Sequence, residues 1–196
     1  HGFRYDDSKL IKRQRDEVVK AIKRLKDHPA LLCWGLGNEM EGPGDKGDSV
    51  RIWKEVNILA GLVKKHDPYH PVMTVVANVN AAKLAAIKKY APLIDILGVN
   101  VYSGAAAMDK TLQDLGWQKP YCLSEYGPPG PWEVGSTTWE APIEPSSRSK
   151  ASIYFAATSS ILDATSKDSK QIGKKYCLGG YAFLWGHKQE TTATWF

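Results

Sequence analysis

The chain has 196 residues and a formal net charge of +5, and 43% of its residues are hydrophobic while 24% are charged. This length fits one domain or a large piece of one, and the composition is typical of a globular protein rather than a disordered one. No apolar run reaches the roughly 18 residues that a membrane helix needs, so we expect no membrane span. The lysines fall on helix-like segments and no aromatic residues are interleaved with base-reading side chains, so we expect no nucleic-acid partner.

Three cysteines, Cys33, Cys122 and Cys177, fit neither a metal-ligand spacing nor a C-x-x-C motif. They lie in or beside apolar runs, so we expect buried free thiols and no metal site.

Predicted helices and strands alternate along the chain. The helical segments are residues 9–26, with Asp7 or Ser8 as its cap, then 48–65, 81–90, 109–115 and 146–164. The predicted strands are residues 28–36, 71–78, 94–102, 119–127 and 178–186. A loop rich in Pro, Gly and Trp covers residues 128–145.

The predicted strands are apolar throughout rather than alternating, which indicates a parallel sheet covered by helices on both faces. Two architectures fit such an α/β chain, a doubly wound sheet and a (β/α)8 TIM barrel. A doubly wound nucleotide-binding sheet would carry G-x-G-x-x-G after a strand, and the sequence GLGNEMEG at residues 35–42 lacks that spacing.

Polar side chains gather at the ends of the predicted strands, which favours the TIM barrel. They are Asn38 and Glu39, Asn78, Asn100 and Tyr102, Glu125, and Trp185 with His187. In a barrel the carboxyl ends of the strands form one rim, and catalytic groups come from several of them.

Glu39 and Glu125 both follow apolar residues, and a carboxylate in such a setting needs a partner or a raised pKa. Each could be a structural ion-pair partner of a nearby Lys or Arg. Two carboxylates that face one cleft are also the groups that hydrolyse glycosides, one as acid and one as nucleophile or base. Two such glutamates are present, and Asn38 and Tyr102 occupy matching positions at strand ends, which favours the second interpretation.

Several segments resemble clan A retaining β-glycosidases, most closely the TIM-barrel catalytic domain of glycoside hydrolase family 2. HPALLCWGLGNEMEG at residues 28–42 resembles the fourth strand of that domain, and KPYCLSEYG at residues 119–127 resembles the seventh. DPYHPV, DILGVNVY and GGYAFLWG are similar to the segments around strands five, six and eight.

This resemblance implies that Glu39 is the general acid/base and Glu125 the nucleophile of a retaining double displacement. It implies that Asn38 holds the sugar 2-hydroxyl and that Tyr102 hydrogen-bonds Glu125. Trp185 would form the floor of the sugar subsite.

Further substrate contacts are weaker hypotheses. Asn100 either faces the site or satisfies a strand end. Trp132 and Trp139 in the loop after Glu125 either bind further sugars or pack locally. His187 either binds substrate or lies in a solvated turn.

The five predicted strands correspond to strands 4–8 of the family, so we expect residues 1–196 to be a single fragment, the C-terminal part of a barrel. Five strands cannot close a barrel. The missing N-terminal strands are therefore expected from the rest of the protein.

The leading hypothesis is a retaining hydrolase of β-linked oligosaccharides or polysaccharides that needs no cofactor. The alternatives are a transglycosylase of the same fold, a non-catalytic carbohydrate-binding barrel, and a lyase, for which no strand clearly supplies the required lysine. The sugar and the linkage are not readable from the residues, although the aromatic loop favours a glucan. An extracellular or periplasmic location is slightly favoured.

Overall fold

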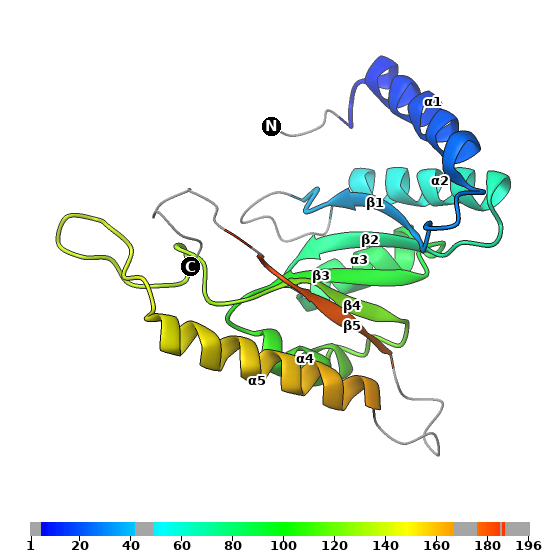
Figure 1. Ribbon diagram of the computed structural model, residues 1–196. Helices are drawn as coiled ribbons and strands as arrows, with labels where there is room; N and C mark the ends of the chain where they lie inside the picture. Colours follow the sequence, from blue (N-terminus) through cyan, green and yellow to red (C-terminus); the bar gives the residue numbers. More distant parts are fainter. Residues whose placement is uncertain (1–4, 42–48, 167–175, 185, 187–196) are drawn as a thin grey trace. The chain divides into compact units, whose positions relative to one another are not determined.

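The computed structural model describes residues 5–41, 49–166, 176–184 and 186, and helices and strands alternate along them (Figure 1). The strands are β1 (Trp34–Asn38), β2 (Val72–Ala77), β3 (Ile96–Val101), β4 (Tyr121–Tyr126) and β5 (Cys177–Ala182). The helices are α1 (Ser8–Leu25), α2 (Val50–His66), α3 (Ala81–Tyr90), α4 (Met108–Asp114) and α5 (Ser147–Ser166), with a 3-10 turn η1 (Ala105–Ala107) before α4.

The five strands follow one another in the sheet in the order β1-β2-β3-β4-β5. Strand β1 is parallel to β2, and β4 is parallel to β5. A doubly wound sheet reverses its strand order at a switch point, whereas a β/α barrel adds each new strand on the same side. The described strands contain no reversal, so the prediction of a TIM-barrel architecture is confirmed.

The chain divides into two compact units, residues 1–98 and 99–196, and the boundary falls within β3. In the first unit α2 packs against β1, β2, α1 and α3. In the second unit α5 packs against β5 and η1.

The first strand begins later than the sequence pattern predicts. We expected residues 28–36, but β1 starts at Trp34 and continues to Asn38. The residues before it form a turn, in which Leu31 N donates to the His28 carbonyl and Ala30 N donates to the His28 ring. The last strand likewise ends at Ala182 rather than at residue 186.

The end strands are more exposed than their apolar sequences predict. Within β1 only Leu36 is buried, and within β5 only Cys177 is buried, whereas β2, β3 and β4 are largely buried. Leu178 and Tyr181 of β5 are 58% and 61% exposed. β1 and β5 are the end strands of this sheet, so each has a neighbouring strand on one side only, and this explains their exposure. Closure of a sheet into a barrel removes such edges.

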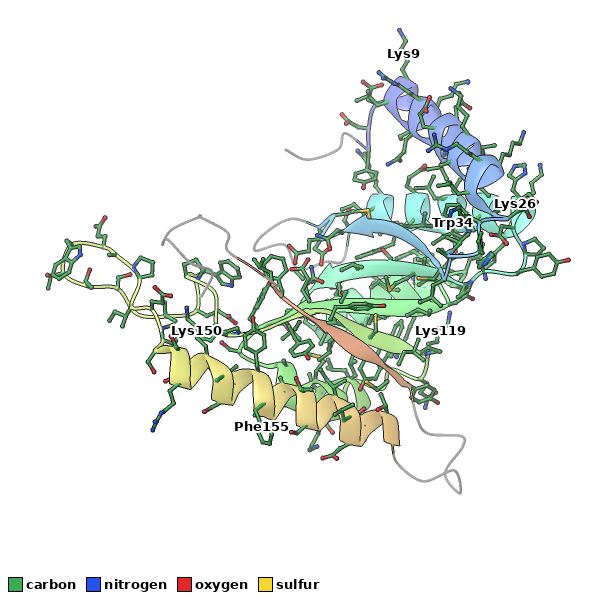
Figure 2. The ribbon with its side chains drawn as sticks, in the orientation of Figure 1. Lys9, Lys26, Trp34, Lys119, Lys150 and Phe155 are labelled. Atoms are coloured by element: carbon green, nitrogen blue, oxygen red, sulfur yellow. The ribbon has the colours of Figure 1, made fainter. Side chains whose placement is uncertain are left out.

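Helix α2 supplies much of the core of the first unit. Trp53, Ala60 and Val63 are completely buried on its inner face. Helix α1 contributes only Ile22 to the core. Its other faces carry exposed charged residues, and Lys9 projects from it in Figure 2.

In the second unit α5 buries Ala157, Ile161 and Ala164, while Phe155 is 75% exposed and points outward from the helix (Figure 2). All three cysteines are free. Cys122 and Cys177 are buried, as predicted, but Cys33 is only half-buried.

Asp67 joins the start of β1 to the turn between α2 and β2. Its Oδ2 accepts a hydrogen bond from Trp34 Nε1 at 2.8 Å and lies 2.7 Å from His70 Nδ1. Its Oδ1 accepts from the backbone N–H groups of Tyr69 and His70. Burial opposes ionisation of this carboxyl, but the hydrogen bonds from Trp34 and His70 outweigh that effect and lower its pKa from 3.8 to about 2.

We predict that Asp67→Asn lowers the free energy of unfolding near neutral pH by about 2 kcal/mol, because one pKa unit corresponds to about 1.4 kcal/mol. The folded pKa is depressed, so this contribution is present above about pH 4 and is lost as the pH falls towards 2. Urea unfolding measured from pH 2 to pH 7 would therefore give wild-type and variant curves that converge at low pH.

The matched control is Asp27→Asn, which removes a carboxylate paired with Lys26 at the surface, where it is 83% exposed. Exposed pairs contribute little, so this variant should follow the wild-type curve at every pH. A constant offset of Asp67→Asn from pH 2 to pH 7 would contradict the prediction.

Candidate active site

The chain turns sharply at the carboxyl end of β1, where Asn38 and Glu39 lie. Gly37 and Glu39 have φ angles of +79° and +48°, and the pairing of β1 with β2 shifts register between Gly35 and Asn38. Glu39 N still donates to the Val75 carbonyl at 3.0 Å. A left-handed conformation is uncommon for a residue other than glycine and is found repeatedly at functional sites.

Asn38 is exposed and Glu39 is half-buried. At the end of the neighbouring β2, Asn78 also has a positive φ of 54°. Its side-chain oxygen accepts from Val79 N. Both strand ends of the first unit therefore carry a polar residue in the left-handed region.

Glu125 lies near the carboxyl end of β4 and is held by a tyrosine. Tyr102, directly after β3, donates its hydroxyl to Glu125 Oε2 at 2.7 Å. The Tyr102 ring is 8% exposed and makes edge contacts with Trp132 and Phe183, with ring centroids 5.8 Å and 6.1 Å away. Because the ring is packed on these neighbours, its hydroxyl is fixed in place against the half-buried carboxylate.

Asn100 is 3% exposed, and its side-chain oxygen accepts a hydrogen bond from Ser124 Oγ at 2.7 Å. This contact supports the strand-end interpretation of Asn100, because it links β3 to β4. Its binding to substrate stays a prediction.

The loop after β4 presents two exposed indoles, Trp132 at 63% and Trp139 at 75%. Trp132 is attached to the site through its contact with Tyr102. The next residue, Glu133, accepts hydrogen bonds from Gly130 N at 2.9 Å and from Ser103 N at 3.4 Å. Glu133 thus ties the loop to the residue that follows Tyr102.

Trp185 and His187 lie outside the described residues. Sequence reasoning missed the contributions of Glu133 and Phe183 around Tyr102. It also missed Glu41 and Lys83, which form a buried pair beside the end of β1. Glu41 follows Glu39 by two residues, but nothing local to it indicates that its partner lies on α3.

Among the described residues, no cluster of three His, Cys, Asp or Glu side chains could hold a metal ion. No helix in the described part of the chain is long and apolar enough to cross a bilayer.

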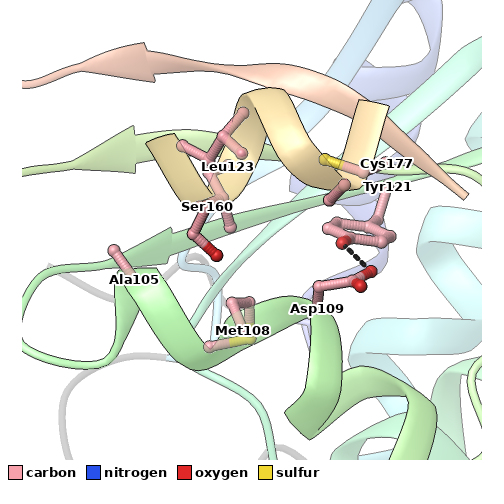
Figure 3. A pocket seen from close by; sticks show the side chains of 9 residues that line it. Ala105, Met108, Asp109, Tyr121, Leu123, Ser160 and Cys177 are labelled. Carbon is pink, nitrogen blue, oxygen red and sulfur yellow. Dashed lines mark hydrogen bonds between the residues drawn. The ribbon is translucent and has the colours of Figure 1, made fainter. Parts of the chain in front are cut away.

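A small cavity of about 10 Å³ lies in the second unit, lined by residues of η1, α4, α5, β4 and β5 (Figure 3). Tyr121 donates to Asp109 Oδ1 across it at 2.6 Å. Burial and this carboxylate raise the pKa of Tyr121 well above its ordinary value. Tyr121 begins β4 while Glu125 is near its end, so the cavity belongs to the packing of α5 and not to the candidate catalytic group.

These features define a β/α-barrel protein with carboxylates at the ends of its strands. The family described as "Glycosyl hydrolases family 2, TIM barrel domain" matches residues 3–136. The chain therefore belongs to glycosyl hydrolase family 2, as its resemblance implied.

A curated relative, a β-galactosidase of Pectobacterium atrosepticum, is 31% identical over 67 residues, which are 34% of this chain and 6% of that protein. The structure of a β-D-glucuronidase of Dictyoglomus thermophilum is similar with a TM-score of 0.68 and 17% identity, over 96% of this chain and 32% of that one. A family 2 β-galacturonidase of Eisenbergiella tayi bound to galacturonate has a TM-score of 0.62 and 16% identity, over 91% and 30%. The chain thus spans about a third of the length of the solved structures.

We predict that Gly37→Ala destabilises the protein by about 1–3 kcal/mol, because a residue with a side chain is strained at this φ. An added Cβ would also lie 2.1 Å from Met40 Sδ, so the Met40 side chain would have to move. Thermal unfolding measures the effect.

Gly35→Ala, in the same strand, is the control, because a Cβ there meets nothing within 4 Å. Its melting temperature should stay close to that of the wild type. Equal melting temperatures for the two variants would contradict the assigned conformation of Gly37.

Proposed function

We propose that the protein to which this chain belongs is a retaining glycoside hydrolase of β-linked glycans, with Glu125 as nucleophile and Glu39 as general acid/base. Membership of family 2 supports the reaction class. The observation that carries the assignment of Glu125 is its hydrogen bond from Tyr102, which orients the carboxyl group near a strand end. In a β/α barrel the carboxyl ends of the strands form the catalytic face, and Glu39 follows β1 at such an end.

In the first step a Glu125 oxygen attacks the anomeric carbon of the substrate. The bond to the leaving oxygen breaks, and Glu39 donates its proton to that oxygen, so that the departing sugar leaves as a neutral alcohol. The product of this step is a glycosyl ester of Glu125 with inverted configuration.

In the second step Glu39, now ionised, takes a proton from water while the water oxygen attacks the same anomeric carbon. The ester bond breaks and Glu125 leaves as a carboxylate. Two inversions return the β configuration, which is the meaning of a retaining mechanism. Two carboxylates supply all of this chemistry, so the mechanism requires no cofactor.

Substrate binding is assigned by the same reasoning. Asn38, adjacent to Glu39, would hold the sugar 2-hydroxyl, where a hydrogen bond strengthens as positive charge develops on the ring. Trp132 offers an exposed indole beside Tyr102 for a sugar to stack on, and Asn100, Trp185 and His187 complete the proposed set. The relatives act on galactosides, glucuronides and galacturonides, so the proposed substrate class is a β-linked hexoside or hexuronide.

We predict that Glu125→Gln in the full-length protein abolishes formation of the covalent intermediate, because the amide is a poor nucleophile. The probes are 2-deoxy-2-fluoro glycosyl fluorides of the gluco, galacto and glucurono series, which form the ester quickly and lose it slowly. Mass spectrometry of the wild-type protein should find one glycosyl group on the peptide that contains Glu125.

The control is Glu140→Gln, an exposed residue of the loop after β4, which should be labelled like the wild type. An unchanged adduct in Glu125→Gln, or a label on another carboxylate, would refute the assignment. NMR of the first-formed anomer tests retention, since an α product from a β-glycoside would make Glu125 a general base.

We predict that Tyr102→Phe lowers kcat/KM by about 10- to 100-fold, because a hydrogen bond to a charged group contributes about 1.5–3 kcal/mol. The ring contacts with Trp132 and Phe183 remain, so the melting temperature should change little. The comparison variant is Tyr126→Phe, which removes the hydroxyl that contacts Thr158 and should leave kcat/KM near the wild-type value. Equal activities of the two variants would show that the Tyr102 hydroxyl does not assist Glu125.

A further inference from the structure

Lys83 of α3 and Glu41 form an ion pair that is almost completely buried beside the end of β1. The residues are 3% and 6% exposed, and Lys83 Nζ lies 2.7 Å from Glu41 Oε1. Burying two charges is costly, and apolar residues of similar size often replace such pairs without loss of stability. The proposed mechanism uses neither side chain, so the pair calls for an explanation other than stability.

The pair binds the backbone at the end of β2. Lys83 Nζ donates to the carbonyl oxygens of Ala77 and Asn78 at 2.6 Å and 3.3 Å. Glu41 Oε1 accepts from Ala77 N at 3.0 Å. Lys83 itself is in the first turn of α3, where its backbone N–H donates to the capping side chain of Asn80. The segment after β1 is thereby joined to β2 and to α3.

The backbone of Glu39 is attached to β2 on both sides of its Cα atom. Its own backbone N–H donates to the Val75 carbonyl, and two residues later Glu41 is bound to Ala77. The left-handed φ of Glu39 costs about 1–3 kcal/mol, and such a conformation persists only where the surroundings hold it in place. The Lys83–Glu41 pair supplies that restraint on the carboxyl-terminal side of Glu39.

We infer that Lys83 and Glu41 are positioning residues for the general acid/base: they hold the backbone of Glu39 so that its carboxyl group reaches the leaving oxygen. This inference rests on the proposed function, because it assigns the pair a role in proton donation. Loss of the pair would then weaken acid catalysis more than attack by the nucleophile.

Leaving groups of different basicity separate these two effects. A phenyl glycoside needs a proton on its leaving oxygen, whereas 2,4-dinitrophenolate departs without one. A defect in acid catalysis therefore slows the phenyl substrate selectively, while a general loss of folded or well-ordered enzyme slows both equally.

The test uses the double variant Lys83→Met/Glu41→Leu of the full-length protein, because removing both charges leaves neither one buried alone. Active sites are counted by the burst of 2,4-dinitrophenolate, so that misfolded protein does not enter the rates. Relative to wild type, kcat/KM should fall about 10-fold or more further for the phenyl than for the dinitrophenyl glycoside. Azide, which needs no general base, should accelerate turnover of the dinitrophenyl substrate by the variant.

The matched control is Arg15→Met/Glu55→Leu, which removes an ion pair of α1 and α2, with Arg15 Nε 2.8 Å from Glu55 Oε1. Glu55 is also buried, at 5% exposed, and accepts two hydrogen bonds from the Arg15 guanidinium. This variant should lose the same factor on both substrates or lose nothing.

Equal losses on the two substrates in Lys83→Met/Glu41→Leu would overturn the inference, as would a crystal structure of that variant with Glu39 unmoved. Glu39→Ala sets the size of the full defect in the same assay. If the wild-type protein turns over neither glycoside of any sugar series, the proposed function itself fails. If Glu39→Ala is selectively slow on the phenyl substrate and the double variant is not, only the positioning role fails.

Discussion

The constraint on which this structure depends is that buried polar groups must be hydrogen-bonded where parallel strands stop pairing. In the first unit Glu41 accepts the backbone N–H of Ala77 at the end of β2. In the second unit Ser124 bonds to Asn100, and Tyr102 bonds to Glu125. Side chains thus add connections between neighbouring strands near their carboxyl ends, where the candidate catalytic residues also lie.

The two carboxylates are restrained in different ways. Glu39 is restrained through its backbone, which is held in a left-handed conformation between two attachments to β2. Glu125 is restrained through its side chain, which accepts the hydroxyl of a packed tyrosine. The difference suits the proposed roles, since a nucleophile must stay ionised and aligned, whereas an acid/base must exchange a proton in each step.

The opposite ends of the strands carry structural contacts. Asp67 binds the indole of Trp34 at the start of β1, and Tyr121 at the start of β4 bonds to Asp109 beside a small cavity. Barrel enzymes separate stability from catalysis in this way, with the chemistry at the carboxyl ends and packing at the amino ends.

The sequence by itself determined the alternation of helices and strands, the parallel sheet, the family, and the polar residues that end each strand. These properties are local, because hydrophobic periodicity and the polar residues that follow a strand can each be recognised within a window of about ten to twenty residues. The predicted start of β1 was wrong. The apolar residues before Trp34 have the composition of a strand, but the residues after His28 form a hydrogen-bonded turn instead. The exposure of β1 and β5 was missed, because burial depends on what lies beside a strand and not on its own residues.

Only the tertiary structure decided the partner of Glu41. Glu41 and Lys83 are 42 residues apart, so their pairing follows from strand order and register. The hydrogen bond between Tyr102 and Glu125, 23 residues apart, was implied by the family resemblance, and the structure confirms it. The sequence does not distinguish Glu133 from other charged loop residues, and its hydrogen bonds from Gly130 and Ser103 are seen only in the structure. The sequence therefore predicts which residues form the candidate site. Most of the contacts that hold those residues are seen only in the structure, because contacts between distant segments have no local sequence pattern.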